Sequence, residues 1–324
     1  MNKFLWIGIL IAFGVASAAA QSPTPVATPA STPVPQTQMP VMRPGLSNLA
    51  RRSTSVREPA ELRQMLLQRY ALPLYRKPGG RELRVLAPDP ALSARYAELL
   101  TRRDSGIFKL VRDAGCAENA RVLNASEECL KYQFPGAGNS FSFRTESYRI
   151  RHLADLTYEA GSFLMPGVHM YGLMVDLGDV PLEPVDLQTR GVRYLTALQP
   201  TNDYAKAVEM DKQAEAGIWQ DGFIYRRGLP AADGHTYVSR SIAYQGRVMK
   251  AIPGAQYNEL EFDKRRDVIT AFKVVQTDPD GAVTIVWTQL SNIESIKLRN
   301  PVKDSTGPLA DKPRTRSKFT GSAF

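Results

Sequence analysis

The sequence predicts an α+β domain in which a helix-rich N-terminal part packs on a mainly antiparallel sheet. Three observations support this fold class. Apolar residues recur at helical spacing between residues 55 and 104, and apolar and polar residues alternate along several runs after residue 140. Asp-Pro-Asp-Gly at 278–281 separates two such runs, as a hairpin turn does. Residues 55–300 therefore form the predicted domain, with candidate internal boundaries near 136 and 200.

The first helix is predicted from a capping box, Ser55 with Glu58, and it is expected to end at Pro73. Residues 83–86 read Leu-Arg-Val-Leu and follow a Lys-Pro-Gly-Gly turn, which predicts a short strand. Asp89 and Pro90 begin a second predicted helix that ends near residue 104. These elements make the front of the domain helix-rich.

Alternation with a period of two predicts the strands that follow. Candidate strands cover residues 141–143, 169–177 and 192–198, and a hairpin is expected over 241–252 with its turn at 245–246. The clearest hairpin joins 268–275 to 283–288. One charged helix over 203–216, capped by Thr201 or Asn202 and ended by Gly217, interrupts the strands.

The first 20 residues have the layout of a secretory signal peptide. Lys3 precedes an unbroken apolar run at residues 4–15, and small residues at 16–20 offer cleavage sites before Gln21. The alternative is an uncleaved anchor formed by residues 4–20, which lie at the short end of the roughly 17–25 residues that cross a bilayer. We therefore expect an exported protein, periplasmic or secreted.

The two ends of the mature chain are predicted to be disordered. Residues 21–54 form a Pro/Thr-rich linker, in which seven prolines between residues 23 and 44 favour extended polyproline II. Residues 301–324 lose hydrophobic periodicity and form a basic tail. The net charge of +9 is unevenly placed, with +8 over residues 43–113, −5 over 114–296 and +5 over 297–324.

Basic flanks around an acidic centre favour an anionic partner. For an exported chain we expect an anionic envelope polymer, a lipid surface or an envelope protein, and no nucleic acid. Insertion into a membrane is expected only if the leader is retained. The sequence makes no prediction about oligomeric state.

Cys116 and Cys129 are the two cysteines of the chain, and an oxidising compartment would join them. No Cys-x-x-Cys spacing indicates a redox site. The predicted disulfide closes a short loop, which stabilises the fold by about 3 kcal/mol in the chain-entropy account.

Candidate catalytic residues come from scattered polar positions, because the sequence has no nucleophile elbow, zinc-binding helix motif or phosphate-binding loop. His152 lies three residues before Asp155, Ser140 follows a Gly-rich loop, and Asp176 and Asp179 begin an acidic stretch. We predict no cofactor and no metal site.

Two functions fit these features. The first is a non-catalytic exported protein that docks on an envelope component or a partner protein. The alternative is a secreted or periplasmic hydrolase of a polysaccharide, peptide or ester that uses the five candidates named above. The tether-like linker, the basic flanks and the lack of a strong catalytic motif favour docking.

Overall fold

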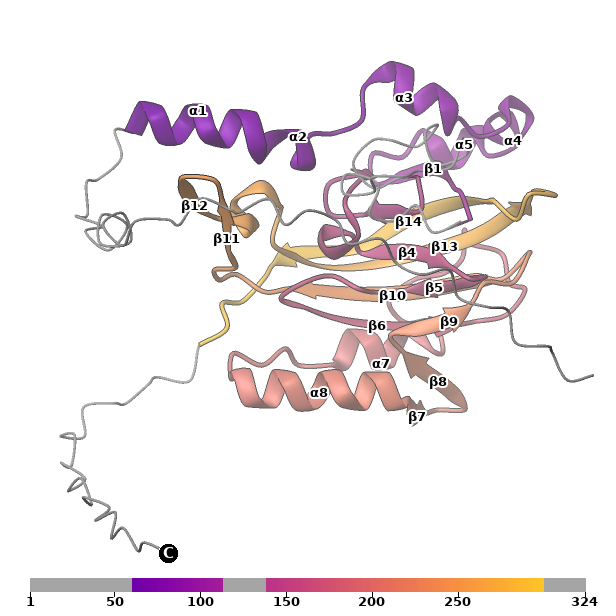
Figure 1. The fold of residues 1–324 in the computed structure, drawn as a ribbon. Helices are drawn as coiled ribbons and strands as arrows, with labels where there is room; N and C mark the ends of the chain where they lie inside the picture. The colour runs from indigo at the N-terminus through magenta and orange to yellow at the C-terminus, as the bar shows by residue number, and fades with distance from the viewer. Residues whose placement is uncertain (1–59, 113–137, 300–324) are drawn as a thin grey trace, which may run out of the picture. The chain divides into compact units, whose positions relative to one another are not determined.

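The computed structural model describes residues 60–112 and 138–299 (Figure 1). The expected leader, linker and tail, and both cysteines, lie outside these ranges. Every pair of neighbouring strands in the described ranges runs antiparallel, and the α-helices of these ranges come before β1 and between β6 and β7. The α+β fold class is therefore confirmed.

The described strands form two sheets and one separate hairpin. The larger sheet has seven strands in the order β1-β14-β13-β10-β6-β8-β7, and the smaller sheet has five in the order β3-β2-β4-β5-β9. The strands of the larger sheet are β1 Ser105–Leu110, β6 Met170–Asp176, β7 Ile218–Gln220, β8 Phe223–Arg226, β10 Thr236–Ala243, β13 Arg266–Thr277 and β14 Val283–Glu294. Those of the smaller sheet are β2 Ser140–Ser142, β3 Ser147–Tyr148, β4 Leu156–Glu159, β5 Ser162–Leu164 and β9 Gly228–Pro230. The hairpin consists of β11 Met249–Ile252 and β12 Ala255–Asn258.

The first core layer lies between the two sheets. Its buried side chains come from both of them and are rich in aromatic rings. Phe108 of β1 stacks on Phe141 of β2 with ring centroids 3.8 Å apart, and Phe143 packs against Trp287 of β14. Burying an aromatic side chain of this size contributes about 1.5–3 kcal/mol, so this layer holds the two sheets together.

The second core layer lies on the other face of the seven-stranded sheet, which two helices cover (Figure 1). These are α7 Val192–Ala197 and α8 Tyr204–Ala216. Tyr171, Leu173 and Val175 alternate along β6 and point into this layer. The alternation expected over residues 169–177 is thus confirmed, because a strand buried on both faces sends successive side chains to opposite layers.

The N-terminal helices follow one another along one side of the domain (Figure 1). They are α1 Ala60–Tyr70, α2 Leu72–Tyr75, α3 Gly80–Val85, α4 Pro90–Arg95 and α5 Ala97–Leu100. A third apolar cluster, which contains Leu67, Tyr75 and Tyr257, packs α1 and α2 on the hairpin β11–β12. Two short 3-10 helices, Arg151–Leu153 and Glu259–Phe262, complete the described elements.

Two predicted elements match the structure because local residues determine them. The β13–β14 hairpin turns at 278–281, where Gly281 has a φ of 83° and donates its N–H to Asp278 O at 2.8 Å. Helix α8 begins and ends where expected, although its cap is Asp203, whose carboxylate accepts from Lys206 N at 3.1 Å. The predicted caps Thr201 and Asn202 lie two and one residues too early, respectively.

Four predicted elements are wrong. Residues 83–86 fall in and just after helix α3, because Glu82 accepts a hydrogen bond from Gly79 N at 2.6 Å and starts a helix there. Residues 192–197 form α7 instead of a strand and Leu198 is its C-cap, since Val192 and Leu195 are spaced to pack one helix face on the sheet.

The other two errors concern the pairing of a hairpin and the end of a helix. The expected 241–252 hairpin does not form, because β10 pairs with β6 and β13 while β11 pairs only with β12. Pro73 does not end the first helix region, as it occupies the first turn of α2, where a proline costs no hydrogen bond. Strand β1 was not expected, since it follows directly on a helical pattern.

Candidate functional site

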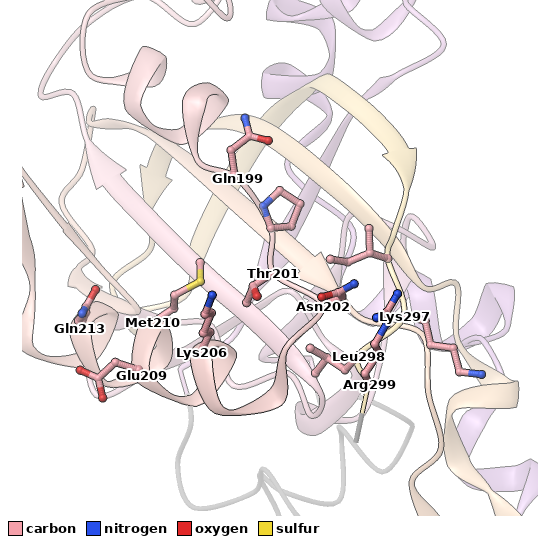
Figure 2. A pocket seen from close by; sticks show the side chains of 12 residues that line it. Gln199, Thr201, Asn202, Lys206, Glu209, Met210, Gln213, Lys297, Leu298 and Arg299 are labelled. Atoms are coloured by element: carbon pink, nitrogen blue, oxygen red, sulfur yellow. The ribbon is translucent and has the colours of Figure 1, made fainter. Parts of the chain in front are cut away.

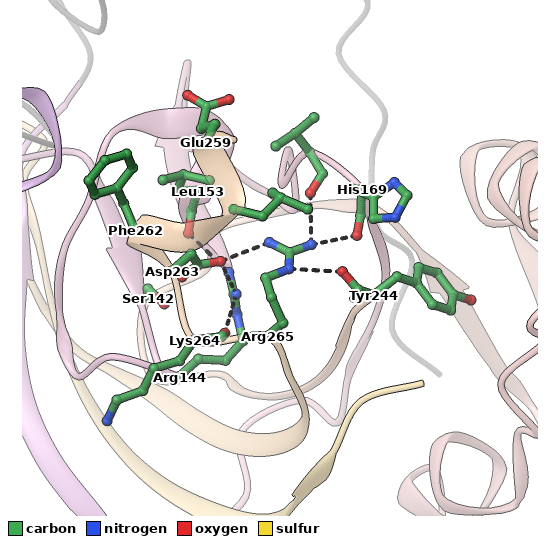
Figure 3. Close-up of polar contacts among 12 residues, drawn as sticks. Ser142, Arg144, Leu153, His169, Tyr244, Glu259, Phe262, Asp263, Lys264 and Arg265 are labelled. Atoms are coloured by element: carbon green, nitrogen blue, oxygen red, sulfur yellow. Dashed lines mark hydrogen bonds and ion pairs between the residues drawn. The ribbon is translucent and has the colours of Figure 1, made fainter. Parts of the chain in front are cut away.

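A fully buried charge network centres on Arg144, between the end of β2 and the start of β13 (Figure 3). The Arg144 Nε lies 2.6 Å from Asp155 Oδ1, and its Nη1 pairs with Asp263. Both pairs have side chains with an exposed fraction of 0%. Burial opposes the charge on Arg144, but the two carboxylates outweigh burial and raise its pKa. Asp155 and Asp263 therefore serve to keep this guanidinium charged inside the fold.

Arg265 extends the same network toward β6. Its Nη1 lies 2.8 Å from Asp263 Oδ2, and its Nη2 donates to the carbonyl oxygens of Val168 and His169 at 3.0 and 2.5 Å. Burial and the neighbouring Arg144 lower the pKa of Arg265 to about 10. The network thus ties the loop before β13 to the chain that enters β6.

Two of the predicted candidates lie in this region and are enclosed. Asp155 also accepts a hydrogen bond from Ser142 Oγ at 2.8 Å, so both of its oxygens are engaged. Ser140 is fully buried in β2, where its hydroxyl contacts Asn139 Oδ1 at 3.0 Å and Thr157 Oγ1 at 2.9 Å. Neither side chain faces solvent in this structure, and both link strands of the smaller sheet.

His152, whose side chain is 42% exposed, contacts a buried carboxylate that its sequence neighbours do not reveal. Its Nε2 lies 2.5 Å from Oε1 of Glu259, whose residue is 1% exposed. Tyr75 donates its hydroxyl to the same oxygen at 2.7 Å. Burial raises the pKa of Glu259, but these two hydrogen bonds and the nearby Lys250 outweigh burial and lower it. His152 therefore contacts Glu259, and not the expected Asp155.

Asp176 and Asp179 lie at another place in the fold, at the end of β6. Asp176 Oδ2 lies 2.9 Å from Nδ1 of His235, which directly precedes β10. Asp179 Oδ1 accepts from Lys273 Nζ at 2.9 Å, and this bond lowers the pKa of the exposed Asp179 carboxyl. The structure thus separates the five candidates into three groups. Ser140 and Asp155 lie in and beside the smaller sheet, His152 lies beside Glu259, and Asp176 and Asp179 lie at the end of β6.

An open groove runs beside the first half of α8 (Figure 2). Residues 199–202, α8 and residues 296–299 line its volume of about 1220 Å³. The backbone N–H of Arg299 donates to Asn202 O at 2.7 Å and fixes the end of the described chain against this loop. Lys206, Lys297 and Arg299 line the groove with a single carboxylate, Glu209, so its charged groups are mainly basic.

Positive charge is concentrated in the N-terminal part of the described chain. Residues 60–112 contain eleven Lys and Arg against five Asp and Glu, whereas residues 138–299 contain eighteen against twenty. Arg76 pairs with Glu82, but Arg69, Arg81 and Arg84 are exposed and have no carboxylate partner among the described residues. The exposed helices α1–α3 therefore present uncompensated positive charge to solvent.

No group of three or more metal-ligating side chains occurs within residues 60–112 and 138–299. No helix in these ranges is long and apolar enough to cross a membrane. Comparison with the models of known families, with curated proteins and with solved structures finds no match to this chain.

Proposed function

We propose that this chain is an exported, non-catalytic protein that docks on an anionic component of the cell envelope. The observation that carries the proposal is the separation of charge in the fold. Unpaired arginines lie on α1–α3, while buried carboxylates such as Asp155, Asp263 and Glu259 are taken up by internal contacts. Such a basic face attracts an anionic surface, with a strength that falls as salt screens the charges.

Binding of the full chain to purified cell wall and to membranes tests this proposal. At low salt the chain is expected to sediment with at least one of these fractions. At about 1 M salt, where the Debye length falls to about 3 Å, it is expected to be released. A chain that stays in solution at low salt contradicts docking by charge.

Two charge variants make the test specific to the N-terminal helices. Arg81→Gln with Arg84→Gln removes two exposed positive charges from α3 and is expected to weaken binding at low salt. Arg193→Gln with Lys206→Gln also removes two exposed positive charges, but from helices α7 and α8. This variant is the matched control and is expected to bind as the parent does. Removal of residues 301–324, which carry a net positive charge, is expected to weaken binding further.

A secreted hydrolase is the second candidate, and the Asp176–His235 contact favours it. A carboxylate that holds one ring nitrogen of a histidine leaves the other available for acid–base work. Hydrolysis of a simple aryl ester by the full chain, lost in His235→Gln and retained in Glu183→Gln, would support this candidate. Equal rates of hydrolysis for the two variants and the parent chain would show that His235 takes no part in hydrolysis and would contradict this candidate.

A further inference from the structure

Exposed apolar side chains gather on the same helices that carry the unpaired arginines. Eleven large apolar residues of the described chain are exposed, and six of them lie between residues 62 and 85. Their exposed fractions run from 39% to 56%. The six are Leu62, Met65, Tyr70, Leu72, Leu83 and Val85. Single exposed apolar residues are common, but here more than half of them fall on three consecutive helices, α1 to α3, and such a concentration is typical of an interaction site.

One face of the segment 62–85 packs on the rest of the domain, and the other face is exposed to solvent. Leu67 of α1 packs in the apolar cluster with Tyr257, which fixes the side of α1 that faces the hairpin. Leu62, Met65 and Arg69 are three and four residues apart, so they share a different face of the helix. At the other end of the run, Leu86 is buried directly after α3. The exposed side chains are therefore held outward by an anchored segment.

The mixture of apolar and basic side chains distinguishes between anionic partners. On α3, Arg81, Arg84 and Val85 are three and four residues apart and share one face, and Leu83 lies on another, all of them exposed. An anionic polymer offers charge to the arginines but no apolar layer for the other two. The surface of an anionic bilayer offers both, because apolar side chains enter the boundary of the acyl chains while arginines contact lipid phosphates.

We propose that residues 60–85 dock the domain peripherally on the surface of an anionic lipid bilayer. Val85, which shares one face of α3 with Arg81 and Arg84, enters the headgroup boundary together with the exposed apolar face of α1, while Arg69, Arg81 and Arg84 bind the lipid phosphates. The inference rests on the proposed function and names its partner. It requires no spanning segment, in keeping with the described helices.

Sedimentation with vesicles tests the inference. The full chain is mixed with vesicles of phosphatidylcholine, with or without phosphatidylglycerol, and all variants keep the same N-terminus so that the apolar residues 4–15 contribute equally. Leu83→Ser with Val85→Ser removes the apolar contact and is expected to lower binding to the anionic vesicles about tenfold. Arg81→Gln with Arg84→Gln is expected to lower it by at least about tenfold. Ile293→Ser, at a site with a similar exposed fraction of 53%, is the matched control and is expected to bind as the parent does.

A spectroscopic variant reports insertion directly. Val85→Trp is expected to show a blue shift of its fluorescence on anionic vesicles and none on phosphatidylcholine alone. Thermal unfolding of each variant checks that the substitutions, which all lie at exposed sites, leave the fold intact.

The outcomes separate the two proposals. Loss of vesicle binding in both α3 variants, with Ile293→Ser unchanged, supports bilayer docking. Binding to anionic vesicles that does not change in Leu83→Ser with Val85→Ser overturns the bilayer contact and leaves docking by charge. Binding to purified cell wall without binding to vesicles has the same consequence. Binding to neither at low salt overturns both proposals.

Discussion

Arg144 and Asp155 form an ion pair with 2.6 Å between Nε and Oδ1, and both side chains are fully buried. Arg144 follows β2 and Asp155 precedes β4, so the pair joins two neighbouring strands where their backbone pairing stops. The backbone N–H of Arg144 also donates to Asp155 Oδ2 at 3.2 Å. Asp155, which the sequence offers as a catalytic candidate, thus has a structural role as the buried partner of Arg144.

Arg144→Met is expected to destabilise the domain strongly. The substitution leaves Asp155 and Asp263 buried without their shared cation, and breaking a buried pair in this way costs about 3–5 kcal/mol. Urea unfolding measures the change. The matched control is Lys212→Gln, whose pair with Glu209 is 3.9 Å long and has exposed fractions of 69% and 61%. That variant is expected to change the free energy of unfolding by at most about 0.5 kcal/mol, and equal midpoints for the two variants would contradict the role of Arg144.

Glu259 is expected to make the stability of the domain depend on acid pH. Its pKa is lowered in the folded state, because the hydrogen bonds from His152 and Tyr75 outweigh the effect of burial. A carboxyl with a lowered pKa stabilises the folded state above its ordinary value of 4.5, and this stabilisation is lost as the pH falls through the folded-state pKa. The melting temperatures of the parent chain and of Glu259→Gln are therefore expected to converge below pH 4.5.

Exposed Glu183 supplies the control for this pH dependence. Glu183→Gln is expected to follow the melting curve of the parent chain throughout. A constant difference in melting temperature between the parent chain and Glu259→Gln, from neutral pH to pH 3, would show that Glu259 gains nothing from ionisation.

His169 is expected to add a second pH dependence at milder acidity. It stands just before β6 with a φ of 52°, and burial and the nearby Arg265 lower its pKa. The unfolded chain then binds a proton at about pH 6.5 and the folded chain does not, so stability falls as the pH drops from 6.5 toward the folded-state pKa. His169→Asn tolerates the positive φ and is expected to lose this fall in a series of thermal unfolding curves. An unchanged slope in the variant would assign the effect to another group.

The sequence predicted the elements whose residues specify them locally. The 278–281 turn and the 203–216 helix carry their own turn and capping residues, and both lie where expected. The short segments 83–86 and 192–198 are predicted as strands but lie in or next to helices, because a few apolar residues fit a strand as well as a buried helix face. Packing on the sheet decides between the two, and packing is not visible in a short window.

The polar clusters were not predictable for a different reason. Glu259 meets Tyr75 and His152 across sequence separations of 184 and 107 residues. Arg144 and Asp263 are 119 residues apart. No local spacing marks such partners, so the sequence proposed neighbours such as His152 and Asp155 that the fold sends to different clusters. The exposed apolar residues of α3 were missed because they were assigned to a strand.

Cys116 and Cys129 are expected to be joined in the exported protein, although they lie outside the described residues. Thiol titration of the unfolded chain is expected to find no free thiol before reduction and two afterwards. Reduction is expected to lower the free energy of unfolding by about 3 kcal/mol, since it releases the constraint on the unfolded chain. The double variant Cys116→Ser with Cys129→Ser is the control, because its stability should not respond to reductant. Two titratable thiols in the exported protein would contradict the disulfide.

The leader prediction separates docking from anchoring. Removal of residues 1–20 gives an exported chain that begins at Gln21, with Ala19 as the close variant, and N-terminal sequencing with intact mass identifies either one. A processed chain has lost the apolar residues 4–15, so any membrane association must come from the folded domain and its basic ends. Such association is expected to be released at about 1 M salt. A chain that keeps Met1 and stays with membranes through this wash is held by residues 4–20. In that case the arginines of α1–α3 are not required for membrane attachment.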